Sequence, residues 1–280
     1  MEHYSPGGFR ILPPVVKNLI IINGLLFLAT LATINNPRID LVNMLGLHYF
    51  AAEQFSPYQF ITYMFMHSPN NFMHIFFNMF ALWMFGNALE NIWGAKRFII
   101  YYVITGIGAA IVHYVVFYLQ ISPVLTAIDT FLDNPSHDQL KVFLASDNFK
   151  IASYTIQDSF HLFRNEYNNL IHENPHRALQ LGIDFMVQYK IDFLNAPVVI
   201  GASGAVFGIL LAFGMMFPNA IIYLFFAIPI KAKYFVILYG ALELFNGVRG
   251  AESNIAHFAH LGGMIFGYFV LIYWRRQKNI

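Results

Sequence analysis

The chain alternates long apolar runs with short polar segments, and each long run is a candidate to cross a membrane as a helix. The six runs cover residues 18–34, 72–89, 98–119, 200–217, 234–247 and 258–274. A helix that crosses the hydrocarbon core needs about 20 mostly apolar residues. An additional apolar stretch at 221–230 is a candidate for the membrane interface. No small-residue cleavage site follows the first run, which predicts a retained span rather than a removed signal peptide.

The basic residues predict how these spans are oriented. They precede the first run, separate the second from the third and the fourth from the fifth, and follow the sixth: Arg10, Lys17, Lys96, Arg97, Lys231, Lys233, Arg275, Arg276 and Lys278. With six spans, all of these segments fall on one side of the membrane. Segments rich in Lys and Arg stay in the cytoplasm, so both termini are expected there.

The connection between the third and fourth runs is unusually long and polar. Residues 120–196 contain nine acidic and five basic residues, and the predicted topology places them outside the cytoplasm. The expected organisation is therefore 1–119 with spans one to three, a polar extracytoplasmic insertion at 120–196, and 197–280 with spans four to six. The insertion is either a lid or docking module for a substrate, or an appendage without a role in chemistry.

Composition narrows the class of protein. Hydrophobic residues make up 58% of the 280 residues and charged residues only 11%, whereas soluble domains carry about 25% charged residues. An all-α membrane protein is therefore predicted. A net charge of +1 gives no reason to expect a nucleic-acid partner. The absence of cysteine excludes thiolate ligands and nucleophiles, no H-E-x-x-H motif occurs, and we expect neither metal nor cofactor.

Polar residues inside the apolar runs are costly and are therefore candidates for function. His74 and Asn78 are four residues apart, which places them on one face of the second span. They can serve chemistry, or they can simply bond one helix to its neighbour. Both interpretations remain open at this stage.

A serine and a histidine stand at the starts of the fourth and sixth runs. Ser203 lies in Gly201-Ala202-Ser203-Gly204, with Gly208 one turn further on, and His260 is followed by Gly263 and Gly267 on the same helix face. Glycine lets two backbones approach closely. Close packing of the two faces would bring Ser203 within hydrogen-bond reach of His260, the arrangement that activates a serine nucleophile.

Other ionisable residues are weaker candidates. His257 is a rival base one turn before His260, but it lacks glycines at the matching positions, so His260 is favoured. His67 and His113 are interpreted as surface or packing residues, and Glu90 and Glu243 as structural hydrogen-bonding groups.

Taken in order, these motifs resemble the rhomboid family of intramembrane serine proteases. The matching pieces are His74-x-x-x-Asn78 in the second span, Gly201-Ala202-Ser203-Gly204 at the fourth, and Ala259-His260-Leu261-Gly262-Gly263 with Gly267 in the sixth. Glu90 followed by Gly94 also fits the pattern. The resemblance covers about 20–120 and 197–274 and implies a six-helix rhomboid-like bundle.

The resemblance implies a role for each matching residue. Ser203 is the nucleophile and His260 the general base, without an acidic third member. His74, Asn78 and the Ser203 backbone N–H form the oxyanion hole, and Phe207 packs on the catalytic histidine. In the first outer loop, where the family often has Trp-Arg after a proline, this chain has Pro57-Tyr58-Gln59.

The function implied is intramembrane endopeptidase activity on transmembrane segments of other proteins, in the lipid bilayer of the bacterial inner membrane. A catalytically inactive relative that binds or escorts client proteins is the alternative. A channel or transporter is disfavoured because paired intramembrane charges, broken helices and repeated halves are not visible in the sequence.

Overall fold

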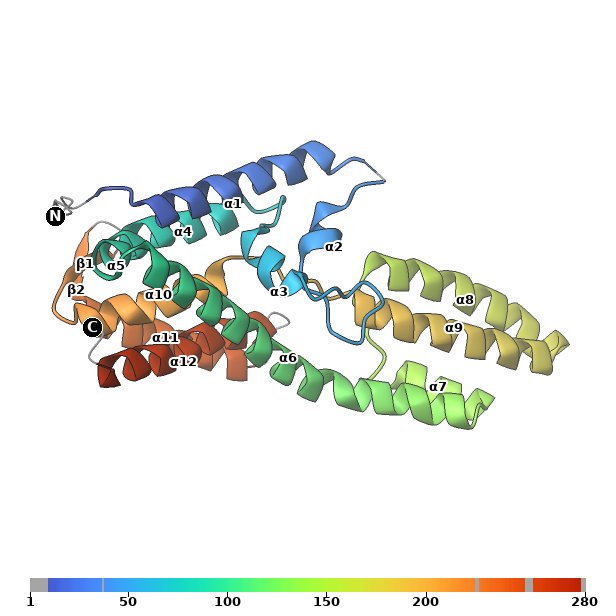
Figure 1. The fold of residues 1–280 in the computed structure, drawn as a ribbon. Helices are drawn as coiled ribbons and strands as arrows, with labels where there is room; N and C mark the ends of the chain where they lie inside the picture. The colour runs from blue at the N-terminus through green and yellow to red at the C-terminus, as the bar shows by residue number, and fades with distance from the viewer. Residues whose placement is uncertain (1–9, 37, 225–226, 250–253, 278–280) are drawn as a thin grey trace, which may run out of the picture. The chain divides into compact units, whose positions relative to one another are not determined.

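The computed structural model describes residues 10–36, 38–224, 227–249 and 254–277, and it is mostly helical (Figure 1). The chain divides into two compact units. The first comprises residues 1–47, 57–114 and 199–280, and the second comprises 48–56 and 115–198. Among the basic residues used to predict orientation, Lys278 lies outside the described residues.

Several helices are long and apolar enough to cross a membrane, which confirms the membrane class. Among the described residues there are four: α1 (Pro14–Thr33), the helical segment Phe72–Trp93, α6 (Ala95–Asp133), and His257–Arg276 within α12 (Asn254–Arg276). Helices α10 (Ser203–Met216) and α11 (Ala232–Val248) have 14 and 17 residues. The predicted count of six spans depends on these two shorter helices and stays a prediction.

The start of α1 is fixed by a carboxylate from another helix. The Val15 and Val16 backbone N–H groups donate to the two side-chain oxygens of Glu90 at 2.9 and 2.8 Å. The first N–H groups of a helix have no partner within the helix, and the N-terminus attracts negative charge. Glu90, only 3% exposed, therefore has the structural role expected for it.

The second apolar run is one continuous helical segment with an irregular middle. It consists of α4 (Phe72–Ala81), a π-helical turn η2 (Leu82–Gly86) and α5 (Asn87–Trp93). At its end the Gly94 N–H donates to the Glu90 carbonyl at 2.9 Å, with φ at +76°. Because side chains disfavour positive φ, glycine is the residue suited to this turn, and α6 begins directly after it.

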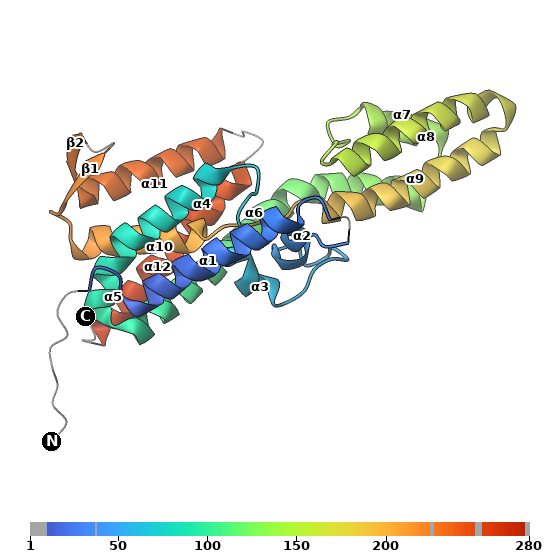
Figure 2. The same cartoon turned by 90° about the horizontal axis from the view of Figure 1, so that it is seen from above.

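Helix α10 runs through the interior of the first unit and packs against α4, α5, α11 and α12 (Figures 1 and 2). It also meets the first part of α6, where the Tyr101 hydroxyl donates to the Gly208 carbonyl at 2.8 Å. Nine of its side-chain positions are buried, so its uniformly apolar sequence follows from contact on all sides.

Short elements connect α1 to α4. These are α2 (Leu41–Leu45), α3 (Gln59–Thr62) and the 3₁₀ turn η1 (Tyr63–Phe65). The Tyr58 hydroxyl and the Gln59 amide both donate to the Met44 carbonyl, at 3.2 and 3.4 Å. The residues that depart from the Trp-Arg pattern thus connect the two sides of this loop.

Two strands follow α10. β1 (Ile221–Leu224) pairs antiparallel with β2 (Ile228–Lys231), with Ile221 opposite Lys231. The apolar stretch expected at the membrane interface therefore forms a hairpin, although residues 225 and 226 between the strands lie outside the described residues.

The second unit has its own aromatic core. It contains the last part of α6, then α7 (His137–Ala145), α8 (Tyr154–Glu173) and α9 (Pro175–Asn195). Phe163 and Phe185 stack at 4.2 Å between ring centroids, and Tyr189 continues the stack. Helix α6 passes through residue 120 without a break, so the predicted start of the insertion falls inside a helix.

Candidate active site

The segment that leads into α10 is held on both sides by backbone hydrogen bonds. Val199 forms a two-bond bridge with Leu47, at 2.9 Å in each direction, and the Gly201 N–H donates to the Tyr63 carbonyl at 2.9 Å. Gly201 has a φ of +127°, and a Cβ at this position would lie 2.8 Å from His74 Nε2. Glycine therefore permits both the turn and the approach of His74.

Ser203 and His260 meet as the sequence predicts. His260 Nε2 lies 2.8 Å from Ser203 Oγ, within the distance of a good hydrogen bond. Ser203 is the first residue of α10 and His260 lies in the second turn of α12. The two helices can come this close because Gly263 has no Cβ. A Cβ at this position would overlap the carbonyl oxygen of Gly204.

Three other glycines, which were expected to lie between α10 and α12, instead contact α6. A Cβ at Gly204 would overlap Ala109, one at Gly208 would lie 2.6 Å from Thr105, and one at Gly267 would overlap Tyr101. All three contacts are with α6. Of these four glycines, Gly263 brings the α10 and α12 backbones together, and the other three make room for α6.

An aromatic stack supports the His260 ring. Phe207, one turn after Ser203, lies parallel to it, with 4.2 Å between centroids and 5° between planes. Tyr239 from α11 also stacks on Phe207, at 5.3 Å and 17°. This contact agrees with the packing that the family resemblance implies for Phe207, and it restricts the tilt of the imidazole.

His74 and Asn78 lie on the neighbouring helix α4. The Asn78 amide donates one hydrogen to the His74 backbone carbonyl at 2.7 Å, and an amide has two such hydrogens. The Ser68 N–H approaches His74 Nδ1 at 3.5 Å. A neutral imidazole that accepts at Nδ1 carries its proton on Nε2, the nitrogen that lies beside Gly201.

His67 is a buried neighbour of His74 rather than a surface residue. Its ring is fully buried and packs edge-on against His74, with 4.9 Å between centroids. Burial is the main cause that lowers the pKa of His67 to about 3, and the nearby His74 adds to it. The His67 ring is therefore neutral at physiological pH and adds no positive charge beside His74.

Glu243 on α11 was expected to be a structural hydrogen-bonding group, but the sequence did not indicate its partners. Its Oε2 accepts from the Nδ1 atoms of both His257 and His260, at 2.6 and 3.0 Å. His257, the rival base, thus points its Nδ1 at Glu243. The ligand atoms of these three side chains lie within 4.8 Å of one another, a spacing that a metal ion could bridge. The expected absence of a metal was based on the spacing of histidines and carboxylates along single helices. It stays a prediction.

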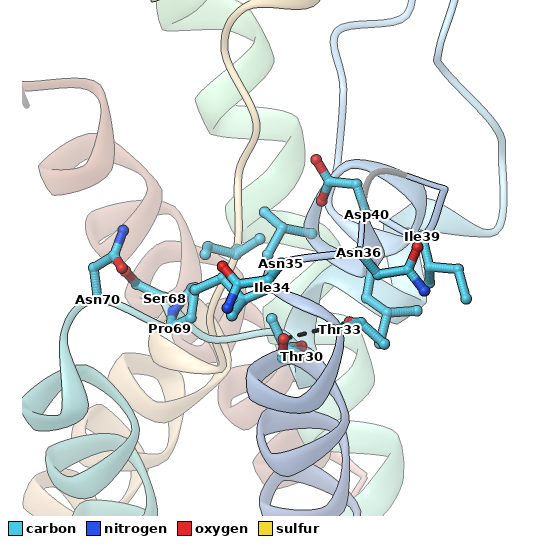
Figure 3. A pocket seen from close by; sticks show the side chains of 13 residues that line it. Thr30, Thr33, Ile34, Asn35, Asn36, Ile39, Asp40, Ser68, Pro69 and Asn70 are labelled. Carbon is cyan, nitrogen blue, oxygen red and sulfur yellow. Dashed lines mark hydrogen bonds between the residues drawn. The ribbon is translucent and has the colours of Figure 1, made fainter.

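A cavity of about 630 Å³ opens beside the residues that support the site (Figure 3). It is lined by the end of α1, the turn that follows, Ser68–Asn70 and Ile200. Ser68 approaches His74 Nδ1, and Ile200 directly precedes Gly201. Ser203 and His260 do not line this cavity, so the cavity lies beside segments that position His74 and Gly201 and does not contain the serine–histidine pair.

Comparison with known proteins identifies the family. The family model of the Rhomboid domain matches residues 54–123 and 179–277, which together make up more than half of the chain. Residues 124–178, between the two matched parts, belong to the second compact unit. No curated protein and no solved structure matches the chain. On the family match, this chain belongs to the rhomboid family.

Proposed function

We propose that this protein is an intramembrane serine endopeptidase in which Ser203 is the nucleophile and His260 the general base. The observation that carries the proposal is the 2.8 Å contact between His260 Nε2 and Ser203 Oγ. A serine hydroxyl is a weak nucleophile by itself and needs an adjacent base to accept its proton. Membership in the rhomboid family, whose members are generally such proteases, supports the same assignment.

In the proposed reaction, Ser203 Oγ attacks the scissile carbonyl carbon while its proton passes to His260 Nε2. The tetrahedral intermediate then collapses, His260 gives the proton to the leaving amine, and an acyl-enzyme remains on Ser203. Water repeats the sequence with His260 as base and releases the carboxylic acid. Hydrolysis inside a bilayer requires water at the site, which calls for a cavity open to one side of the membrane.

His74 Nε2, an Asn78 amide hydrogen and the Ser203 backbone N–H are proposed to stabilise the oxyanion. The orientation of His74 favours this role, because its Nε2 lies beside Gly201, two residues before Ser203. Ser203 is the first residue of α10, so its N–H is one of the groups that a helix leaves without an internal partner. Loss of a single oxyanion donor typically costs about 10²–10³ in rate.

The proposed substrates are transmembrane segments of other membrane proteins. A helical segment shields its peptide bonds with its own hydrogen bonds, so it must unwind locally before Ser203 can attack. The proposed location is the bacterial inner membrane, with both termini in the cytoplasm and residues 120–196 on the opposite side.

Replacement of the nucleophile tests the proposal. We expect Ser203→Ala to abolish cleavage of a model single-span substrate in proteoliposomes, because loss of a catalytic serine lowers kcat by about 10⁶-fold. The thermal unfolding midpoint of the variant should stay close to that of the wild type. Cleavage at the wild-type rate by Ser203→Ala would exclude the serine mechanism.

Labelling with a fluorophosphonate identifies the base in the same preparation. Labelling of Ser203 should be lost in His260→Ala and retained in His257→Ala. The reverse result would show that His257 is the base. A folded wild-type protein that neither reacts with the fluorophosphonate nor cleaves substrate would instead fit an inactive relative that binds client proteins.

A further inference from the structure

Glu243 stands where a serine hydrolase with three catalytic side chains has its acid. Its Oε2 lies 3.0 Å from His260 Nδ1, and the opposite ring nitrogen of His260 lies 2.8 Å from Ser203 Oγ. The three side chains come from α11, α12 and α10. The Glu243 side chain is 11% exposed and that of His260 is 20% exposed, so water has little access to the contact between them.

This contact determines which nitrogen of His260 carries the proton. A carboxylate can only accept hydrogen bonds, so the bond to Glu243 places the His260 proton on Nδ1. Nε2 is then unprotonated and can accept the Ser203 hydroxyl proton. The opposite tautomer would present an N–H to Ser203 and could not act as a base.

We propose that Glu243 is the positioning residue that holds His260 in its base-competent tautomer and stabilises the imidazolium formed during attack; this rests on the proposed protease function. When Ser203 Oγ bonds to the carbonyl carbon, its proton moves to His260 Nε2. The Nδ1 proton stays on nitrogen, hydrogen-bonded to Glu243, which remains ionised throughout. The Nε2 proton then leaves with the amine as the C–N bond breaks. The site thus has a serine, a histidine and a carboxylate rather than a pair alone.

Among the side chains described around the His260 ring, Glu243 is the one that carries a negative charge. His257 on α12 donates to the same Oε2 at 2.6 Å. His74 on α4 is a further imidazole of the site, and Tyr239 on α11 stacks on Phe207, which stacks on His260. His257 thus links α12 to α11 through the same carboxylate. Glu243 and Tyr239 lie on one face of α11 because they are four residues apart.

The test compares Glu243→Gln with His257→Gln in the reconstituted full-length protein. Glutamine keeps the size of the side chain and removes its charge. We expect Glu243→Gln to lower kcat for a model single-span substrate by about 10²–10⁴-fold, with KM within about twofold, since only the transition state is affected. His257→Gln replaces the imidazole that donates to the same oxygen, and should change kcat by less than about threefold.

Restoration of the charge separates catalysis from folding. The kcat of Glu243→Asp should be at least tenfold higher than that of Glu243→Gln, because aspartate returns a carboxylate to the same helix position. Equal kcat in the wild type and in Glu243→Gln would overturn the proposal. An equal loss of kcat in Glu243→Gln and His257→Gln would also overturn it, because it would show that the carboxylate only links α11 to α12. Activity lost on chelation and restored by Zn²⁺ would make the three side chains a metal site and also overturn it.

A measurement on the wild type does not depend on how any variant folds. In protein labelled with ¹⁵N-histidine, with the His260 signals assigned by their loss in His260→Ala, the His260 nitrogen shifts should show protonated Nδ1 and unprotonated Nε2. The opposite tautomer would contradict the role of Glu243. Activity measurements on Ser203→Ala distinguish a failure of the inference about Glu243 from a failure of the protease proposal. If Ser203→Ala is inactive while Glu243→Gln is fully active, only the inference about Glu243 fails.

Discussion

At Gly263 the packing leaves no room for a single methyl group. The position that a Cβ would occupy coincides with the carbonyl oxygen of Gly204 on α10, and this is backbone that cannot rotate away. The consequence reaches the candidate site, because Ser203 directly precedes Gly204 and His260 lies one turn before Gly263. The hydrogen bond between Ser203 and His260 therefore depends on the separation of the two backbones.

Gly263→Ala is expected to damage both stability and activity. Overpacking of a well-packed interior costs typically about 1–3 kcal/mol, and the helices can relieve it only by moving apart. We expect a lower thermal unfolding midpoint in detergent, together with at least tenfold slower fluorophosphonate labelling of Ser203.

The matched control for this substitution is Gly24→Ala in α1. A Cβ at Gly24 meets nothing within 4 Å, and alanine is favoured over glycine in a helix by up to about 1 kcal/mol. Gly24→Ala should therefore leave both measurements unchanged or raise the midpoint. Labelling at the wild-type rate in Gly263→Ala would show that the backbone contact does not position the pair.

Part of the site could be predicted from spacing along single helices. His260 and Gly263 share a face of α12, and Ser203 and Gly204 begin α10, so close packing of the two helices predicted the contact between Ser203 and His260. The packing of Phe207 on His260 was implied by the family resemblance rather than by spacing. Glu243 had no such signal. Its bonds to His257 and His260 arise only when α11 packs against α12, and periodicity does not say which helices are neighbours.

At the scale of elements, α1 is joined to the second apolar segment by one side chain. The Glu90 carboxylate satisfies two backbone N–H groups in the first turn of α1. Replacement by glutamine keeps one accepting oxygen but turns an NH₂ group toward the second N–H. A buried donor without an acceptor costs about 1–3 kcal/mol.

Glu90→Gln should consequently lower the free energy of unfolding by an amount in this range. Equilibrium unfolding in mixed micelles measures the change, and the exposed Glu166→Gln of α8 is the control that should show none. An effect of equal size in both variants would mean that loss of an acidic charge, rather than of the cap, is responsible.

Element boundaries were harder to predict than the presence of elements. The apolar runs at 18–34 and 98–119 correspond to α1 and to the first part of α6, because apolar length is a direct signal. The continuation of α6 to Asp133 was hidden by the change from apolar to polar residues, which marks a change of surroundings rather than the end of a helix. The β1–β2 hairpin is short and apolar, and periodicity alone does not distinguish such a run from a buried helix.

At the scale of the whole molecule, the distribution of charge predicts which side of the membrane each part faces. Because the chain contains no cysteine, single cysteines can report on this without background. Tyr154 in α8 is 87% exposed, and Lys96 lies in the first turn of α6. The two positions fall on opposite sides in the proposed topology.

Tyr154→Cys should react with a membrane-impermeant maleimide in intact bacterial cells from which the outer membrane has been removed. Lys96→Cys should react only after the inner membrane is permeabilised, because loops rich in basic residues stay in the cytoplasm. Labelling of Lys96→Cys, but not of Tyr154→Cys, in the intact preparation would reverse the proposed orientation.

The π-helical turn η2 allows both ends of the second segment to face into the protein. In a regular α-helix, at about 100° per residue, Asn78 and Glu90 would point about 120° apart. A π turn accommodates one more residue than an α turn, which removes about 100° of that difference. Asn78 and Glu90 are 7% and 3% exposed, as this rotation allows. The irregular turn thus rotates the two ends relative to each other, so that one continuous helical segment presents the proposed oxyanion donor Asn78 at one end and the cap of α1 at the other.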